Sequence, residues 1–103
     1  MKLQYTPEAI QDLKEIIGYI RHVLHNPTAA KRIGRAILDN CSQLKQYPFS
    51  GMFLQEKTGY KTDLRVLVCE NYLALYRVEE NMISVSRIFD GRQNYLLELF
   101  DDE

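Results

Sequence analysis

The sequence lacks any long uninterrupted hydrophobic run. No stretch approaches the ~18 to 20 consecutive apolar residues that a membrane-spanning helix requires. The start of the chain is also unlike a signal peptide, because residues 1–3 lead directly into polar Gln4 and Thr6. We therefore expect a cytoplasmic protein with no membrane association.

An excess of positive charge is also missing. The 13 Lys and Arg residues are balanced by 14 Asp and Glu residues, which leaves a formal net charge of −1. Proteins that bind nucleic acid through its phosphates usually carry a clear positive excess, because counterion release supplies much of their affinity. The overall charge therefore disfavours such a protein, and the positions of individual arginines matter more than their number.

Cysteine and histidine are too few and too scattered to indicate a metal site. Cys41 and Cys69 each lie in an apolar run, with no CxxC motif and no nearby histidine pair. We expect both to be small buried hydrophobic residues. His22 and His25 are spaced to share a helix face, but no further ligand is near, and a position at a helix C-terminus explains them better. No metal and no cofactor is predicted.

The chain also has no internal repeat, low-complexity tract or flexible linker, so residues 1–103 are predicted to form a single domain. Residues 2–5 alternate like a strand. Thr6 and Pro7 are typical of a helix N-terminus, as are Asn26 and Pro27. Apolar residues then recur every three or four positions over 7–25 and over 27–47. These residues are predicted to form two antiparallel helices joined by a short turn.

The second half of the chain has the composition of strands. Residues 64–69, 72–78 and 82–89 are rich in β-branched and aromatic residues and are separated at hairpin distances. Residues 49–62 are predicted to be a loop, with a partly extended segment as the alternative, and 94–100 a short closing helix. The expected fold is α+β, in the order β-α-α-β-β-β-α. A helical hairpin packs on one face of a small, mainly antiparallel sheet, and the other face stays partly open.

Several short motifs occur in an ordered set along nearly the whole chain. They are residues 5–9 before the first helix, 26–30 at the hairpin, Pro48 with Gly51, 64–65, 71–72, 76–78 and 87–95. In this order and at these spacings the chain resembles the RelE/ParE toxin superfamily, which includes plasmid stabilisation proteins.

The resemblance implies the bacterial toxin of a type II toxin–antitoxin module, which arrests growth unless a cognate antitoxin neutralises it. The antitoxin of such a module usually wraps the toxin with a helical or extended segment. It often binds operator DNA through its own second domain, so no direct operator binding by this chain is expected. Members of the superfamily act in two ways. RelE-like toxins cut mRNA on the ribosome without metal, and ParE-like toxins inhibit DNA gyrase.

Metal-free RNA cleavage would need a base, cations that stabilise the phosphorane, and an acid for the leaving oxygen. Arg65, Arg87 and Arg92 are candidate cations, and Tyr95 is a candidate proton donor or stacking surface. Arg65 and Arg87 come from one predicted sheet and could share a face. If the protein is an enzyme, it is thus a metal-independent endoribonuclease. Alternatively, these arginines are solvated or paired with Asp63, Glu70 or Asp90.

Two departures disfavour the nuclease. Many RelE-like relatives carry arginine where this chain has Leu73, and histidine where it has Asp90, a residue that would be ionised near neutral pH. The hairpin at residues 26–30 is also more ParE-like. We therefore favour action on a protein target such as DNA gyrase, with an apolar partner-binding groove between the helical hairpin and the sheet edge. The alternatives are the ribosome-dependent nuclease and a degenerate antitoxin-binding protein without activity.

Overall fold

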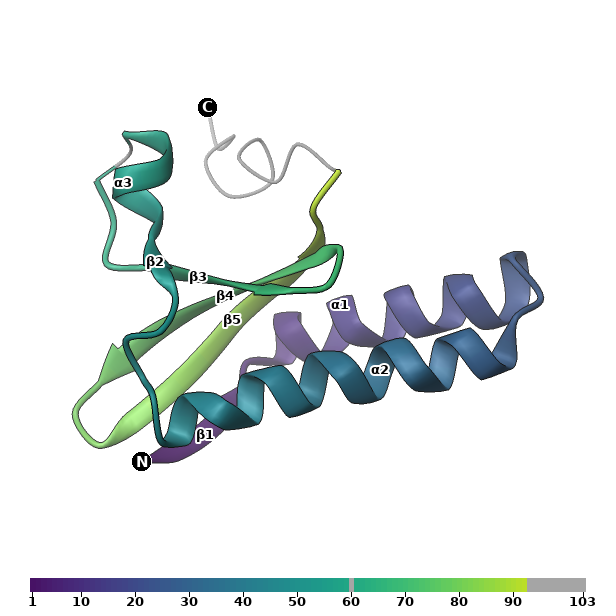
Figure 1. Cartoon of the computed structure of the whole chain (residues 1–103), viewed down its shortest axis with the longest axis horizontal. Helices are drawn as coiled ribbons and strands as arrows, with labels where there is room; N and C mark the ends of the chain where they lie inside the picture. The colour runs from purple at the N-terminus through teal and green to yellow at the C-terminus, as the bar shows by residue number, and fades with distance from the viewer. Residues whose placement is uncertain (60, 93–103) are drawn as a thin grey trace.

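The computed structural model describes residues 1–59 and 61–92, and it has the predicted α+β architecture (Figure 1). Two long helices form a hairpin on one face of a sheet, which has five strands within the described residues. The elements are β1 Lys2–Tyr5, α1 Pro7–Gly18, a π-helical segment Tyr19–Val23, α2 Pro27–Ser42, a 3-10 turn Gln43–Lys45, β2 Met52–Phe53, α3 Leu54–Thr58, β3 Arg65–Cys69, β4 Tyr72–Glu79 and β5 Met82–Asp90.

Both long helices begin at the predicted capping residues. The Thr6 hydroxyl accepts a hydrogen bond from the Ala9 amide at 3.1 Å, and the Asn26 side chain accepts one from the Ala29 amide at 3.0 Å. A proline follows each cap in the first turn, where its missing N–H leaves no bond unmade. The helical hairpin predicted from the sequence is therefore confirmed, including its start points.

The sheet has the strand order β1-β5-β4-β3-β2. Strands β2 to β5 pair antiparallel with their neighbours, whereas β1 pairs parallel with β5, so the first strand joins the last. The turns between the three long strands contain Glu70 and Asn81, both in the left-handed region at φ 57° and 59°. The three predicted strands of the second half, and the added N-terminal strand, are confirmed.

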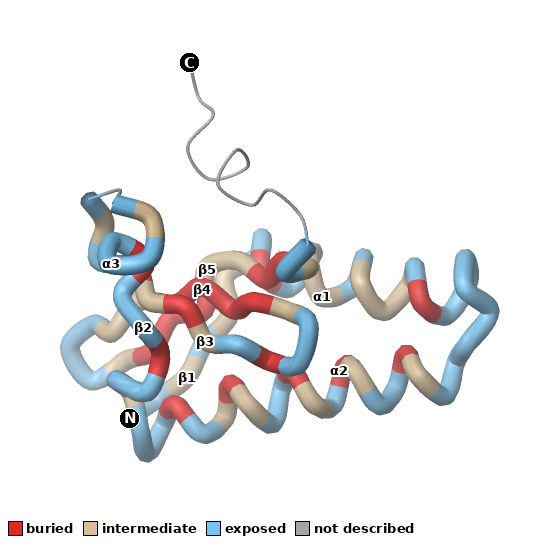
Figure 2. Tube along the Cα trace, turned by 45° about the horizontal axis from the view of Figure 1, so that its top comes forward, coloured by how far each residue is buried: buried red, intermediate tan, exposed pale blue. Residues whose placement is uncertain are grey.

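The strands of the sheet contain many buried residues (Figure 2), and these belong to two separate hydrophobic clusters. The larger cluster lies under the helical hairpin and contains Ala9, Ile37, Cys41, Leu44, Cys69, Ala74, Tyr76, Ile83, Val85 and Ile88. The smaller cluster contains Leu54, Leu64, Val66, Leu73, Leu75 and Phe89. Both cysteines are buried and free, as predicted. The hydrogen bond with Cys41, together with burial, raises the pKa of the Cys69 thiol, which therefore stays protonated.

The prediction for residues 49–62 is wrong in part: the extended stretch occurs as β2, but the segment also contains the helix α3, which was not predicted. Leu54 at the start of α3 is fully buried in the smaller cluster, and its amide donates to the Leu64 carbonyl at 2.9 Å. Elements of two and five residues are too short to produce a periodic pattern, so contacts distant in the sequence stabilise them. The predicted closing helix at 94–100 lies outside the described residues. No helix within the described part of the chain is long and apolar enough to span a membrane.

Candidate functional site

A β-bulge in β5 decides where the candidate arginines lie. Tyr76 of β4 pairs with Val85, but the preceding residue, Leu75, pairs with Arg87, so Ser86 is an extra residue in β5. A bulge moves the side chains that follow it to the opposite face of the sheet. Val85 therefore faces the helical hairpin, and Arg87 is in register with Leu75 of the opposite face.

The expectation that Arg65 and Arg87 could share a face is wrong. Arg65 pairs with Tyr76, whereas Arg87 pairs with the adjacent residue of the same strand, Leu75. Adjacent residues of a strand point to opposite faces. Without the bulge, strict alternation would have kept Arg87 on the same face as Val85, which is the face of Tyr76.

Arg65 holds the segment before β2 against β3. Its guanidinium donates to the carbonyl of Gly51 at 2.8 Å, and lies 3.9 Å from the ring centre of Phe53 and 4.9 Å from that of Phe49. The buried Tyr76 hydroxyl contacts the same segment, because it accepts from the Gly51 amide at 2.9 Å and donates to the Pro48 carbonyl at 2.8 Å. These contacts assign Arg65 a structural role.

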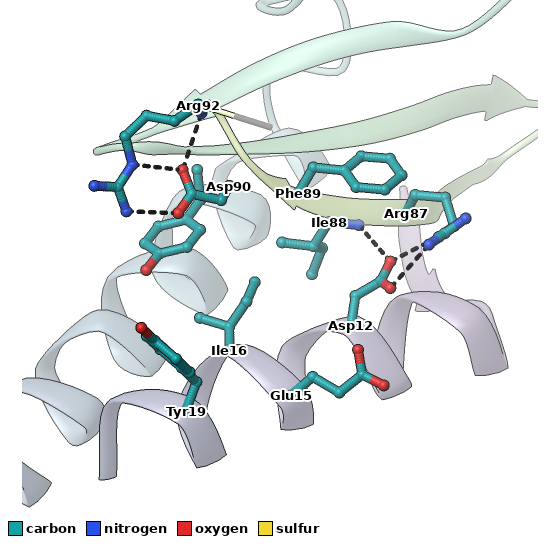
Figure 3. Close-up of a pocket in the computed structure, with 10 residues that line it drawn as sticks. Asp12, Glu15, Ile16, Tyr19, Arg87, Ile88, Phe89, Asp90 and Arg92 are labelled. Atoms are coloured by element: carbon teal, nitrogen blue, oxygen red, sulfur yellow. Dashed lines mark hydrogen bonds and ion pairs between the residues drawn. The ribbon is translucent and has the colours of Figure 1, made fainter. Parts of the chain in front are cut away.

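Arg87 is bound by Asp12 of α1 (Figure 3). Its Nε and Nη2 donate to the two Asp12 oxygens at 2.7 and 3.1 Å, and the Ile88 amide donates to Asp12 Oδ2 at 2.9 Å. The guanidinium carbon also lies 4.5 Å from the ring centre of Phe89. The Asp12 side chain is only 11% exposed and that of Arg87 25%. This ion pair therefore joins α1 to β5 in a partly desolvated setting.

Arg92 is bound by Asp90, one of the carboxylates that the sequence offered as an arginine partner. Nε and Nη2 of Arg92 donate to Asp90 at 3.0 and 2.7 Å, and its backbone amide donates at 2.9 Å. The hydrogen bonds from Arg92 lower the pKa of Asp90, which stays ionised near neutral pH as predicted. The other two proposed acidic partners bind different arginines: Asp63 pairs with Arg77, and Glu70 with Arg32.

A groove of about 420 Å³ runs between α1 and the end of β5. The sequence predicted an apolar partner-binding groove between the helical hairpin and the sheet edge, but this groove is lined by charged as well as apolar residues. Its apolar lining consists of Ile16, Tyr19, Tyr72, Ile88 and Phe89, and its charged lining of Asp12, Glu15, Arg87, Asp90 and Arg92. Burial, together with the nearby Asp90 carboxylate, raises the pKa of the Tyr72 phenol, so this hydroxyl stays neutral and is a poor base. The fourth candidate, Tyr95, lies outside the described residues.

The groove is better suited to a peptide than to a phosphate. Three carboxylates line it, and both arginines that line it are already bound to two of them. An anion entering the groove would have to break an ion pair and approach the remaining charges. No cluster of three or more potential metal ligands occurs in the described residues.

Asp12 is the residue of the groove that sequence reasoning missed. It lies beside Leu13 on an amphipathic helix and close to the apolar stripe, where a carboxylate needs a partner if it is to be buried. That position was the available signal. The identity of the partner could not be read from the sequence, since Arg87 is 75 residues away along the chain.

Comparison with known proteins identifies relatives that share the family and the fold. A family model described as the ParE toxin of the type II toxin–antitoxin system parDE matches residues 3–95. A solved structure of the chromosomal ParDE toxin–antitoxin system from P. aeruginosa superimposes with a TM-score of 0.73 at 26% sequence identity. The match covers 87% of this chain and 95% of that one. No curated protein sequence matches.

Proposed function

Because this chain belongs to the ParE toxin family of type II toxin–antitoxin systems, we propose that it arrests growth by inhibiting DNA gyrase and is held inactive by a cognate antitoxin. The toxin class and the antitoxin partner follow from the family. The choice of a protein target over RNA cleavage rests on the chemistry of the candidate site.

The observation that carries this choice is the state of the candidate arginines. Arg65 is bound to the Gly51 carbonyl, Arg87 to Asp12 and Arg92 to Asp90. Cations that stabilise a phosphorane must be aimed at the place where charge develops, and must not be neutralised by carboxylates of the same site. Arg65 is in addition on the opposite face from Arg87. The geometry therefore favours a surface for protein contact.

The groove between α1 and β5 is the proposed site of the antitoxin. It combines apolar and charged side chains, which is the composition of a groove that accepts an amphipathic helix or an extended segment. Tyr19 lines it and is 54% exposed, so a partner would bury a large aromatic surface there. Glu15 on the rim suits an occupant with a positive charge.

The antitoxin site is tested by a matched pair of tyrosine substitutions. Tyr19→Ala removes the ring in the groove, which is 54% exposed, and Tyr47→Ala removes a ring of similar exposure, 63%, that does not line it. We expect Tyr19→Ala to weaken binding of the antitoxin by roughly tenfold or more, the effect of losing an aromatic anchor. Tyr47→Ala should leave binding unchanged. Equal effects of the two substitutions would contradict the assignment.

The molecular activity is tested by inducing the toxin alone and reading growth, plasmid supercoiling and primer extension on cellular mRNA in the same culture. Growth arrest with altered supercoiling and intact mRNA is the expected result. Arrest with cut mRNA would support the ribosome-dependent nuclease instead. Absence of arrest would leave a protein that only binds its antitoxin. Purified gyrase should also lose supercoiling activity on addition of the toxin and regain it when the antitoxin is added.

A further inference from the structure

The distal half of the helical hairpin extends beyond the sheet as an arm (Figure 1). We define this arm as residues 17–39, comprising the end of α1, the π-helical segment and most of α2. The π-helical segment packs chiefly on the two helices themselves. Most positions near the tip of the arm are exposed (Figure 2). The buried residues of the arm that lie closest to the tip are Ile20, Ala30 and Gly34. A small domain gains little stability from such an extension, so its surface is a candidate for binding.

The arm concentrates positive charge in a chain whose net charge is −1. The sequence contains no aspartate or glutamate between Glu15 and Asp39, but it contains Arg21, Lys31, Arg32 and Arg35 there. Among residues 1–59 and 61–92, only Arg32 of these four forms an ion pair, with Glu70 at 3.0 Å. The other three are exposed. This uneven distribution produces a local positive field that the total charge conceals.

These cations surround an apolar depression between the two helices of the arm. A cavity of about 390 Å³ is lined by Ile17, Ala30, Gly34 and Leu38 and by the charged side chains of Arg21, Lys31, Arg35 and Asp39. Leu38 is 42% exposed, and near the tip Val23 and Leu24 are 58% and 55% exposed. Gly34 keeps the helices close, because a Cβ there would lie 2.9 Å from Ile17 Cδ1. We call this surface the arm groove.

We propose that the arm groove binds an acidic, amphipathic segment of the protein that the toxin inhibits. This inference rests on the proposed protein target. An apolar floor with a rim of three cations and one carboxylate, positive on balance, complements a segment that carries both apolar and acidic side chains. A nucleic acid offers phosphates to the rim, but its polyanionic backbone presents little apolar surface to cover Ile17 and Leu38. The groove between α1 and β5 is lined by carboxylates and differs in charge, which suits two separate partners.

The test reverses two charges of the rim, Lys31→Glu together with Arg35→Glu. Both side chains are exposed and neither forms an ion pair in the described residues, so the variant is expected to fold. The control is Lys45→Glu together with Lys61→Glu, which makes the same change in net charge at exposed positions outside the arm. Thermal unfolding and circular dichroism of both variants verify that the fold is kept.

We expect the arm variant to inhibit gyrase about a hundredfold more weakly than the wild type, roughly tenfold for each reversed contact. The control variant should inhibit as well as the wild type. Binding to the antitoxin, supplied as the product of the neighbouring gene, should be unchanged for both variants. Raising the salt concentration should weaken inhibition by the wild type more than inhibition by the arm variant, since salt screens the charges that the variant has lost.

Other outcomes overturn the proposal. Equal inhibition by the arm variant and the control would show that the rim does not contact the target. Loss of antitoxin binding would assign the arm groove to the antitoxin. Binding of an RNA or duplex DNA probe by the wild type, lost in the arm variant, would assign it to nucleic acid. If the wild type arrests growth without inhibiting gyrase, the gyrase proposal fails by itself. Growth arrest that is weaker for the arm variant than for the control then still supports the arm groove, and equal arrest overturns it.

Discussion

Replacing Asp12 by alanine removes a side chain that bonds α1 to both the side chain of Arg87 and the backbone of β5. The substitution eliminates three hydrogen bonds, two from the Arg87 guanidinium and one from the Ile88 amide. It also leaves the charge of Arg87, whose side chain is only 25% exposed, without this carboxylate. We expect α1 to lose its fixed position against β5 and the groove between them to change shape.

The size of the effect follows from burial. Breaking a buried ion pair by removing one partner costs about 3–5 kcal/mol, and a hydrogen bond to a charged group contributes about 1.5–3 kcal/mol. The pair is partly exposed, so solvent screening places the expected cost near the lower limit, at about 3 kcal/mol. For a domain of this size that corresponds to a fall in the melting temperature of roughly 12–24 °C.

The assay is urea unfolding of Asp12→Ala beside Asp63→Ala. Asp63 also accepts two hydrogen bonds from an arginine, Arg77, at 2.8 and 2.9 Å, but that pair is 69% and 39% exposed. Exposed pairs of this kind contribute about 0.2–1 kcal/mol. A double-mutant cycle with Arg87→Ala measures the coupling between Asp12 and Arg87 directly. If Asp12→Ala costs no more than Asp63→Ala, the ion pair does not hold α1 to the sheet and the reasoning fails.

Three further predictions concern the same sheet. Tyr76→Phe removes the buried hydroxyl between Gly51 and Pro48 and should cost about 1–3 kcal/mol in urea unfolding, whereas no loss would show that water replaces it. Gly51→Ala places a Cβ 2.6 Å from the Val66 carbonyl oxygen and should lower the free energy of unfolding by about 1–3 kcal/mol. In Gly18→Ala the added Cβ meets nothing within 4 Å, so this substitution should stabilise α1 by about 0.5–1 kcal/mol. A reversed order of the two melting temperatures would contradict this. Arg92 lowers the pKa of Asp90 in the folded protein. The stabilisation of the fold by the ionised Asp90 is therefore fully present above pH ~4, and it is lost as the pH falls through the lowered pKa of Asp90. Asp90→Asn should therefore flatten the acid limb of the stability profile, and an unchanged limb would mean that the pair does not form in solution.

The main architecture was predictable because its determinants are local. Thr6 with Pro7 and Asn26 with Pro27 determine the starts of the two long helices, and three runs of β-branched and aromatic residues predicted three strands. The parts that could not be predicted depend on contacts distant in the sequence. Segment 52–58 forms β2 and α3 because Leu54 is buried against the sheet, and no period of its own indicates this.

The candidate site was harder to predict than the fold, for the same reason. Arg65, Arg87 and Arg92 were identified by residue type, but their roles depend on partners that only the folded chain brings close. The extra residue at Ser86 places Arg87 on the face of the sheet opposite Arg65. Neither Ser86 nor Arg87 is a glycine, so nothing in the sequence indicated a bulge there. Arg92 differs from the other two in that its carboxylate partner, Asp90, is near enough in the sequence to be paired by inspection.

The parallel pairing of β1 with β5 has a consequence for the order of events during synthesis. Thr6, which follows β1, donates from its hydroxyl to the carbonyl of Ser86 in β5, and the two residues are 80 positions apart. The strand β1 therefore cannot pair with β5 until most of the chain has been translated, because contacts between residues so far apart in the sequence form late. Until then α1 lacks its neighbour in the sheet and the groove beside Asp12 does not exist. The groove proposed for the antitoxin is thus assembled only after β5 has been synthesised, so a chain that has not yet formed β5 has no such groove to offer a partner.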